Sequence, residues 1–500
     1  MNSLVWMMLA AGLRLDGVTV MDPQALADEL APQVRADLSG AEREALAARV
    51  QARVRAAGRP FARAYLPPLT DQDRAEGVAL RIGVVEGRYG RVEVRGNAAR
   101  EAAPWLDALR PGRPIGDELE RQVQALSRLP GVAVGAGLGP GDAVGEGDVA
   151  LVVDQARRWA LDARLDNHGN RYAGRVRGSV AGHANGLLLF GDRLTASAGG
   201  NNGKGWDGAT AYQVPLGRRG SSVSFTAAHH HYQLGAEFAP LRAQGQVDSA
   251  GLMSTVPLTT RGPGRLIWQL GLEARRMRNE QRSVAIEDRR RAIAMTTGLQ
   301  VVAYPAAGMA AWGGVRAEIG ELRFRDPVAA RMDRQSARTA GQYLVLSADV
   351  ALLRHWTSWG LMLRGSGQMS DRNLDGSRQF ALGGARSVRA WPLGETSGDH
   401  GALLQAELRH RWQSLEPFAF LDAGRVKFHH TPWDTSARGQ ALPRGRTLAG
   451  AGVGVRWQHG PWSAEGAAGW RLAREPWHRQ SLTDPRAKAP QVWVSVSYSL

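Results

Sequence analysis

The last ten residues of the chain, QVWVSVSYSL (491–500), alternate between apolar and polar side chains. One face of such a segment carries Val492, Val494, Val496, Tyr498 and Leu500, and the other carries Ser495, Ser497 and Ser499. Successive side chains of a β-strand point to opposite sides. The pattern therefore predicts a strand with one apolar and one polar face, and its last residue lies on the apolar face.

The same alternation extends back through residues 157–500, where Gly, Asn, Asp and Pro separate short segments. We predict sixteen strands, around 157–167, 172–183, 190–199, 207–216, 221–232, 246–257, 265–278, 291–303, 308–322, 341–353, 357–368, 400–412, 417–428, 446–457, 461–472 and 491–500. Each strand with its connection takes about 21 residues, which suits strands of about ten residues that cross a membrane at a tilt.

A water-soluble β-sandwich also alternates, with its apolar residues turned inward. Three features favour a membrane barrel instead. Charges lie on the polar face of strands that would be central, Trp and Tyr cluster at segment ends, and the apolar terminal strand can close a ring. Closure also removes the exposed edges that an open sheet of this length would have.

Composition narrows the remaining possibilities. The chain has 500 residues, 61 Gly, no Cys and a net charge of +16. The absence of Cys excludes disulfides and cysteine metal sites. The arginines are spread along the whole length, without helix-turn-helix or zinc-finger spacing, so we expect no nucleic-acid partner. The sequence contains no apolar run of about 20 residues that would predict a transmembrane helix.

Residues 1–155 follow a different pattern. Helical spacing occurs in DPQALADELAPQV (22–34) and in SGAEREALAARVQARVRAAG (39–58), where Ser39 and Glu42 predict a capping box. Strand-like segments flank these helices, and the order β-α-α-β-β recurs after about 75 residues. We therefore expect two related α+β domains before the barrel.

Several ordered motifs resemble one family, the outer-membrane transporters of two-partner secretion of the haemolysin secretion/activation (ShlB/FhaC/HecB) type. Those of the N-terminal part are GRPFARAYLPP (58–68), LRIGVVEGRYGRVEVRGN (80–97) and LSRLPGVAVGAGLGPGDAVGEGDVALVV (126–153). Those of the barrel are LDNHGNRYAGRVRG (165–178), FGDRLTAS (190–197), FALGGARSVRAWPLGETSGDHGALLQAELR (380–409) and FAFLDAGRV (418–426).

The resemblance implies two polypeptide-transport-associated (POTRA) domains in the periplasm, at 1–87 and 88–156, and a 16-stranded antiparallel transmembrane barrel at 157–500 in the bacterial outer membrane. It also implies that a loop at about 369–399 folds into the lumen. Its signature residues would be Leu382, Gly383, Gly384, Val388, Ala390 and Trp391. The first barrel hairpin would carry the motif residues Asp166, Asn167, Gly169 and Gly174.

Within LGGARSVRAW (382–391), the resemblance pairs Arg389 with Asp422 on the inner wall. The rigid guanidinium fork matches a carboxylate and stays charged at any working pH. Without the family pattern, an exposed arginine in a surface hairpin is the simpler interpretation. Departures from the pattern are Ala390 in place of Gly, and Leu69 and Thr70 after LPP. The family's plug helix and Pro-rich linker do not fit before residue 12, so we expect the plug to be absent or to lie upstream.

Other signals are weaker. His229 and His231 would share a face near a strand end, but we expect no carboxylate beside them and no metal site. EDRRR (287–291) has the composition of a solvated hairpin tip, where it could meet lipopolysaccharide phosphates. We find no catalytic arrangement and no cofactor motif, so we do not expect an enzyme.

We therefore expect a translocator that moves a secreted exoprotein of the haemagglutinin or haemolysin type in unfolded form, without ATP. Its other partners would be outer-membrane lipid and lipopolysaccharide, and the chain would be monomeric. Three alternatives stay open, namely an assembly factor of the same superfamily, a passive porin-type channel and a barrel enzyme such as a lipase. The sequence does not name the exoprotein or say whether it is a haemolysin or an adhesin.

Overall fold

The computed structural model describes residues 12–35, 37–259, 262–433, 443–472, 481 and 483–500. The start of the chain, where the plug was expected to be missing, lies outside these residues. The chain divides into two compact units, Met1–Ala156 and Arg157–Leu500. Within the described residues, no helix has the length and apolar character needed to cross a membrane.

The first half of the N-terminal unit is a three-stranded sheet with helices on it. Its elements are β1 (Leu13–Asp16), α1 (Pro23–Leu30), η1 (Ala31–Gln33), α2 (Gly40–Ala56), β2 (Arg63–Tyr65), α3 (Asp71–Ala75) and β3 (Leu80–Val85). The strand order is β1-β3-β2. The predicted capping box of Ser39 and Glu42 is confirmed at the start of α2. The apolar face of α2, with Val50 and Val54, packs on Ile82 of the central strand.

The second half repeats this order. It contains β4 (Arg88–Arg95), α4 (Ala99–Ala102), η2 (Ala103–Leu106), α5 (Glu118–Ser127), β5 (Val132–Pro140) and β6 (Glu146–Gln155). Its strand order is β4-β6-β5, so the last strand again lies in the middle, parallel to the first and antiparallel to the one before. β5 is therefore an edge strand, and most of its residues are exposed.

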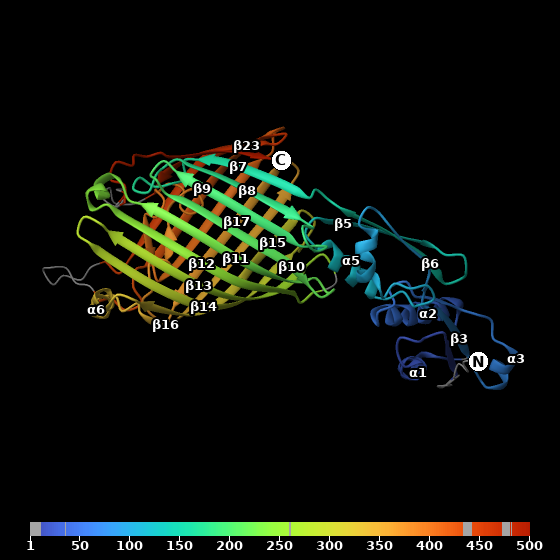
Figure 1. Cartoon of the computed structure of the whole chain (residues 1–500). Helices are drawn as coiled ribbons and strands as arrows, with labels where there is room; N and C mark the ends of the chain where they lie inside the picture. Colours follow the sequence, from blue (N-terminus) through green and yellow to red (C-terminus); the bar gives the residue numbers. More distant parts are fainter. Residues whose placement is uncertain (1–11, 36, 260–261, 434–442, 473–480, 482) are drawn as a thin grey trace. The chain divides into compact units, whose positions relative to one another are not determined.

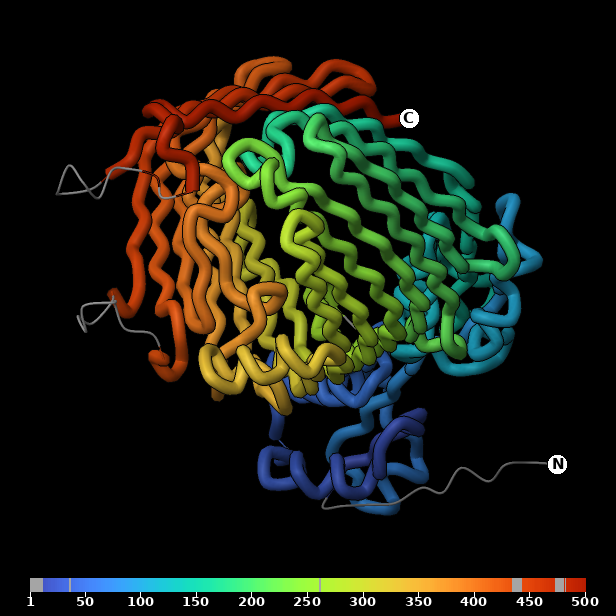
Figure 2. Tube along the Cα trace, turned by 60° about the vertical axis from the view of Figure 1, so that its left-hand side comes forward, coloured from blue at the N-terminus to red at the C-terminus, as the bar shows by residue number. Residues whose placement is uncertain are grey.

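The second unit is a closed barrel of sixteen strands (Figure 1). They are β7 (Trp159–Asp166), β8 (Arg177–Asn185), β9 (Arg193–Asn201), β10 (Trp206–Leu216), β11 (Ser221–Gln233), β12 (Ala243–Pro257), β13 (Arg265–Gln281), β14 (Ile286–Ala303), β15 (Met309–Phe324), β16 (Gly341–Trp356), β17 (Trp359–Ser370), β20 (His400–His410), β21 (Leu415–Lys427), β22 (Gly445–His459), β23 (Trp462–Arg471) and β24 (Gln491–Ser499). Each pairs antiparallel with its neighbours, and β24 pairs with β7 to close the ring (Figure 2). The predicted fold class is confirmed.

The alternation assigns the two faces of the wall. On β24, Val492 and Val494 are exposed on the outer face, whereas Trp493 is buried inside. An exposed apolar outer face and a polar interior are what a lipid-embedded barrel requires. The direction of successive strands also distinguishes the two ends of the barrel. β7 follows the N-terminal unit after two residues. If that unit is periplasmic, as the resemblance implies, the extracellular end of the barrel carries the connections after β7, β9, β11, β13, β15, β17, β21 and β23.

One expectation about local structure was wrong, and three short helices were not predicted. Glu287–Arg291 do not form a hairpin tip, because β14 begins at Ile286 and the turn occupies residues 282–285. Residues 287–291 are all charged, so both faces of this long strand are polar near its start. The short helices α3, α6 (Pro327–Gln335) and η3 (Ala236–Leu241) were not predicted, because they have too few turns to show a helical period.

Candidate functional site

The connection between β17 and β20, residues 371–399, folds back into the barrel, and we call it the lumen loop. Its hairpin strands β18 (Phe380–Leu382) and β19 (Thr396–Gly398) pair with each other. Val388, Ala390 and Trp391 at its inner end are almost fully buried and pack with Val426 and Leu448 of the wall. The tip is thus held against the inner wall and does not lie in solvent.

Arg389 at the tip meets Asp422 of β21. Its Nε donates to Asp422 Oδ2 at 2.9 Å and its Nη2 to Oδ1 at 2.8 Å. Its backbone N–H also donates to Oδ2 at 3.0 Å. Arg389 is 7% exposed and Asp422 is fully buried. The structure therefore brings together the two residues that the resemblance paired, in the two-pronged geometry that fits a guanidinium to a carboxylate.

A second carboxylate, which the sequence analysis did not assign, completes this contact. Arg389 Nη1 donates to Glu407 Oε2 at 2.7 Å. Glu407 lies on the inner face of β20 and also accepts from Arg456 of β22, at 2.8 Å to Oε1. Alternation alone places Glu407 inside the barrel, but it does not show how deep the loop descends. We call Arg389, Asp422 and Glu407 the latch.

Aromatic side chains cover the latch arginine. The guanidinium of Arg389 lies 3.7 Å from the ring centre of Phe420, and that of Arg456 lies 4.1 Å from the ring centre of Phe418. The indole N–H of Trp493 donates to the Arg389 carbonyl at 2.7 Å. Cation–π contacts gain strength when they are shielded from water. The wall therefore satisfies both the charge and the backbone of the loop tip.

Small residues allow the close approach of loop and wall. A Cβ on Gly450 of β22 would lie 2.2 Å from the Cβ of Ala390. A Cβ on Gly469 of β23 would lie 3.0 Å from the Ala390 backbone. Gly383 and Gly384 have φ values of 99° and 106°, a region that favours glycine. Ala390 is not among the residues with positive φ, so its departure from the family pattern causes no backbone strain of that kind.

Trp391 lies between two arginines of the wall. Its indole N–H donates to the Ala449 carbonyl at 3.0 Å. The guanidinium groups of Arg446 and Arg471 lie 5.2 and 4.7 Å from its ring centre. Signature residues Leu382 and Val388 belong to the same buried cluster. These residues fix the orientation of the tip around the latch.

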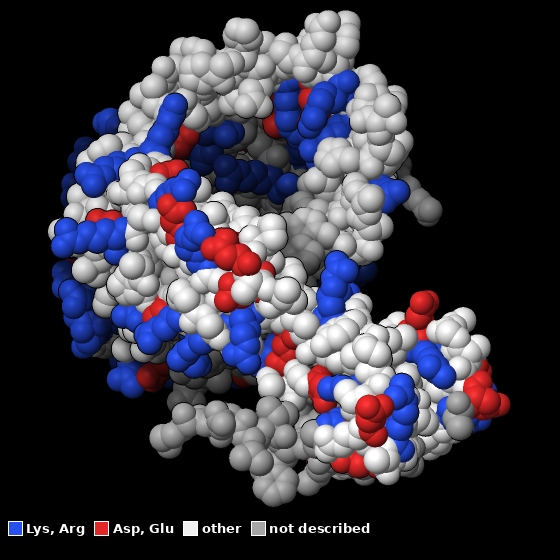
Figure 3. Space-filling model, turned by 90° about the vertical axis from the view of Figure 1, so that its right-hand side faces the viewer, with Lys and Arg blue, Asp and Glu red and all other residues white. Residues whose placement is uncertain are grey.

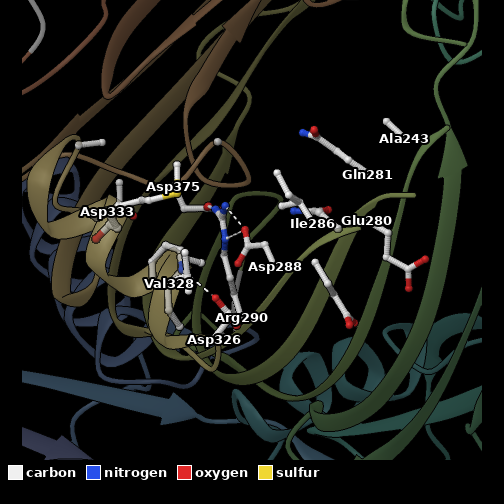
Figure 4. A pocket seen from close by; sticks show the side chains of 18 of the residues that line it. Ala243, Glu280, Gln281, Ile286, Asp288, Arg290, Asp326, Val328, Asp333 and Asp375 are labelled. Atoms are coloured by element: carbon white, nitrogen blue, oxygen red, sulfur yellow. Dashed lines mark hydrogen bonds and ion pairs between the residues drawn. The ribbon is translucent and has the colours of Figure 1, made fainter. Parts of the chain in front are cut away.

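The outer end of the lumen loop has its own ion pairs, which the sequence analysis also missed. Asp375 pairs with Arg290, which points inward from β14 and also binds Asp288 (Figure 4). Arg378 pairs with Glu273 at 2.6 Å and with Glu318 at 2.9 Å. The Asp375–Arg290 pair borders a cavity of about 860 Å³ under α6 at the extracellular end. The loop is therefore held to the wall at both ends.

The motif of the first hairpin lies where the first barrel strand, β7, pairs with the last, β24, and we call this junction the seam. The β7–β24 ladder ends at Asp166, which accepts a hydrogen bond from Arg177 Nε at 2.9 Å. The side chain of Asn167 continues the ladder, because it donates to the Val492 carbonyl at 3.1 Å and accepts from the Val494 N–H at 2.8 Å.

The two motif glycines shape the turn after this seam. A Cβ on Gly169 would lie 1.9 Å from the carbonyl oxygen of Gly174, and Gly174 has a φ of 118°. Larger residues at these positions would push the turn away from the seam. The four motif residues are therefore brought together where the first and last strands meet.

The lumen around the loop tip is strongly basic. A chamber of about 580 Å³ is lined by side chains of both signs, of which arginines are the most frequent: Arg164, Arg364, Arg386, Arg389, Arg409 and Arg456, with Glu407, Glu416 and Glu465. Figure 3 shows Lys and Arg gathered inside the mouth of the barrel. Such a chamber attracts carboxylates and repels cations.

The histidine pair lies on the outer face of β11, where the ring of His229 stacks on Trp206 at 4.6 Å. The expectation that no carboxylate lies nearby was wrong, because His229 Nδ1 is 2.7 Å from Asp248 Oδ1. In the described ranges, no group of three or more His, Cys, Asp or Glu is arranged to hold a metal.

Comparison with protein families gives two matches. Residues 145–457 match the model of the haemolysin secretion/activation protein ShlB/FhaC/HecB. Residues 10–87 match the POTRA domain of the ShlB type. The first match alone covers more than half of the chain.

Individual relatives have low sequence identity to this chain. The heme/hemopexin transporter protein HuxB of Haemophilus influenzae strain 86-028NP is 25% identical over 410 residues, which span 79% of this chain and 71% of the relative. For HuxB of strain Rd the match spans 62% of the relative. The solved structure of CdiB from Escherichia coli is 20% identical, has a TM-score of 0.77 and aligns over 100% of this chain and 92% of its own.

Proposed function

Since the chain belongs to the haemolysin secretion/activation family ShlB/FhaC/HecB, which comprises outer-membrane transporters of two-partner secretion, we propose that it carries one exoprotein of the haemagglutinin or haemolysin type across the outer membrane. The exoprotein passes in unfolded form and without ATP. The barrel spans the outer membrane and the POTRA domains lie in the periplasm.

The observation that carries the proposal is the latch that holds the loop tip on the inner wall of the barrel. Arg389 holds the loop tip to Asp422 and Glu407, with Trp493 on the tip backbone. An extended chain needs the space that this tip occupies. We propose that arrival of the exoprotein displaces the tip, and that the polar inner wall then replaces the latch contacts.

We propose that the POTRA sheets capture the extended partner. β2 and β5 are edge strands, and the exposed apolar residues on or beside the two sheets include Tyr65, Leu138 and Val152. An extended peptide can add to such an edge through backbone hydrogen bonds with little demand on its sequence. The basic chamber at the loop tip favours segments rich in Asp and Glu.

The barrel is also expected to contact the components of the membrane around it. We propose that the monomeric barrel contacts outer-membrane lipid and lipopolysaccharide, and that transport involves no chemical step on the exoprotein. Folding of the emerging exoprotein outside the cell would make transport proceed outward.

Co-expression with a candidate exoprotein tests the proposal. The intact chain should release the exoprotein into the medium, and deletion of residues 1–155 should abolish release while the barrel still inserts. Release that survives the deletion would favour a passive porin-type channel. A general loss of other outer-membrane proteins when the intact chain is depleted would favour an assembly factor.

A further inference from the structure

The outer face of β13, β14 and β15 carries arginines at the extracellular end of the barrel. Arg276, Arg291 and Arg323 lie directly opposite one another on the three neighbouring strands. One level further out lie Arg278 and Arg289, with Arg325 just beyond the end of β15. All six residues are exposed. Like charges placed opposite each other across strands destabilise a sheet, so an anion bound beside these arginines would stabilise this one.

Carboxylates on the same face neutralise only half of the set. Arg278 pairs with Glu280 and Glu287, Arg289 pairs with Glu287, and Arg323 pairs with Glu321. Asp248 lies opposite Arg276, but its carboxylate contacts His229. No carboxylate in the described part of the chain forms an ion pair with the other three arginines, which are Arg276, Arg291 and Arg325.

The height of the three unpaired arginines matches the lipid headgroups. From Ile293 to Ala303, the part of β14 below Arg291 has eleven residues. A tilted strand rises about 2.3 Å per residue along the barrel axis, so this part spans about 25 Å, the height of the apolar band of such barrels. Ile293, Leu272 and Ile319 on the outer face are 67%, 52% and 55% exposed. The arginines thus begin where the apolar band ends.

The lipid face below them is hollowed. A cavity of about 930 Å³ opens on the outer wall of the same strands, and its apolar lining includes Trp268, Leu299, Val315, Ala317 and Leu346. Among the β14 residues that line this cavity, Thr297 lies nearest to Arg291 in the sequence. The separation of six residues between these positions corresponds to about 14 Å along the barrel axis. An acyl chain attached to a phosphorylated headgroup has this reach.

We propose that Arg276, Arg291 and Arg325 bind the phosphate groups of lipid A, the anchor of lipopolysaccharide in the outer leaflet, while its acyl chains cover the apolar wall and hollow below. Arginine matches phosphate through two parallel N–H donors. The hollow on the same strands favours a lipid over free phosphate. The inference depends on the outer-membrane placement of the barrel and does not depend on passage of an exoprotein.

Two charge-matched variants of the full-length protein test the proposal. In the first, Arg276→Gln, Arg291→Gln and Arg325→Gln remove the unpaired arginines. In the control, Arg278→Gln, Arg289→Gln and Arg323→Gln remove three carboxylate-paired arginines from the same strands and face. Binding of purified lipid A to detergent-solubilised protein is counted by native mass spectrometry, with dephosphorylated lipid A and inorganic phosphate as the other two probes.

We expect lipid A affinity to fall about tenfold or more in the first variant and clearly less in the control. Wild-type protein should bind dephosphorylated lipid A weakly, and inorganic phosphate at the lipid concentration should not compete. Equal affinity in wild type and first variant, equal loss in both variants, or full competition by inorganic phosphate would overturn the proposal.

Two further measurements keep the result interpretable. Folding is checked by the resistance of the barrel to SDS before heating, and if the triple variant does not fold, single Arg291→Gln should still weaken binding about threefold or more. Secretion is measured in parallel. Wild-type protein that binds lipid A but secretes no exoprotein would contradict the proposed transport, whereas intact secretion with unchanged lipid A binding in the first variant would contradict only the lipid site.

Discussion

At the scale of single residues, the latch places one buried guanidinium between two buried carboxylates. Removing one partner of a buried ion pair leaves the other charge unpaired and costs about 3–5 kcal/mol. Asp422 is fully buried and loses three hydrogen bonds if the side chain and tip of Arg389 leave. The latch thus favours the closed position of the loop strongly, even if it adds little to the stability of the whole barrel.

We predict that Arg389→Ala releases the loop tip. Single-channel recordings in planar bilayers should show larger and more frequent openings than in wild type. Arg389→Lys should give an intermediate effect, because it keeps the charge but not the two-pronged geometry.

Arg386 provides the matched control for that experiment. It lies three residues away in the same loop, is exposed, and has no ion pair in the described residues. Arg386→Ala should leave the openings nearly unchanged. Openings of Arg389→Ala that resemble those of wild type would show that the latch does not hold the loop.

A carboxylate of the first POTRA domain gives a pH prediction. Burial alone raises the pKa of Glu86, but hydrogen bonds from Thr19, Val20 and Arg59 outweigh it and hold the pKa below its usual range. Because the folded pKa is lowered, this stabilisation is complete above the unfolded value of about 4.3 and is lost as the pH falls further.

Hydrogen–deuterium exchange of the segment around Thr19 and Val20 measures this contribution. Glu86→Gln should exchange faster than wild type at pH 7, with a loss of about 1–3 kcal/mol in protection. The difference should shrink below about pH 4. Glu29→Gln, which changes an exposed carboxylate, is the control. A difference of the same size at pH 7 and pH 3 would refute the assignment.

At the scale of elements, close packing of the lumen loop depends on glycines of the wall strands. We predict that Gly450→Val dislodges the tip, because its Cβ alone would lie 2.2 Å from the Cβ of Ala390. Channel openings should increase as they do for Arg389→Ala. Gly466→Val on β23 is the control, since a Cβ there meets no atom within 4 Å. Wild-type conductance in Gly450→Val would contradict the observed packing.

The strands were predictable because their alternation is local, and the loop contacts were not. Period-two patterning located all sixteen strands, and the capping motif located the start of α2. Their ends were less certain, as the error at Glu287–Arg291 shows, because a run of charges looks like a turn even where the strand continues through it. Glu407 could be assigned to the inner face, but its loop partner depends on how the chain closes in three dimensions, and Arg290 was expected in a hairpin tip.

At the scale of the whole molecule, the alternation of side chains gives the barrel wall one face toward lipid and one face toward the lumen. Apolar side chains face outward along the barrel, and arginines gather in the lumen and above the apolar band. The family-derived pairing of Arg389 with Asp422 agrees with the geometry, whereas its part in transport stays a prediction. The account depends on the lumen loop leaving its position when an exoprotein passes.

Cross-linking the loop to the wall tests this claim most directly. Gln405 of β20 donates to the Ser387 carbonyl of the loop at 2.8 Å, and the chain has no native cysteine to interfere. Ser387→Cys with Gln405→Cys can therefore be joined by a short, reducible thiol cross-linker, with each single variant as a control. We predict that secretion of the exoprotein stops on cross-linking and recovers on reduction. Secretion at the wild-type rate by fully cross-linked protein would contradict the account.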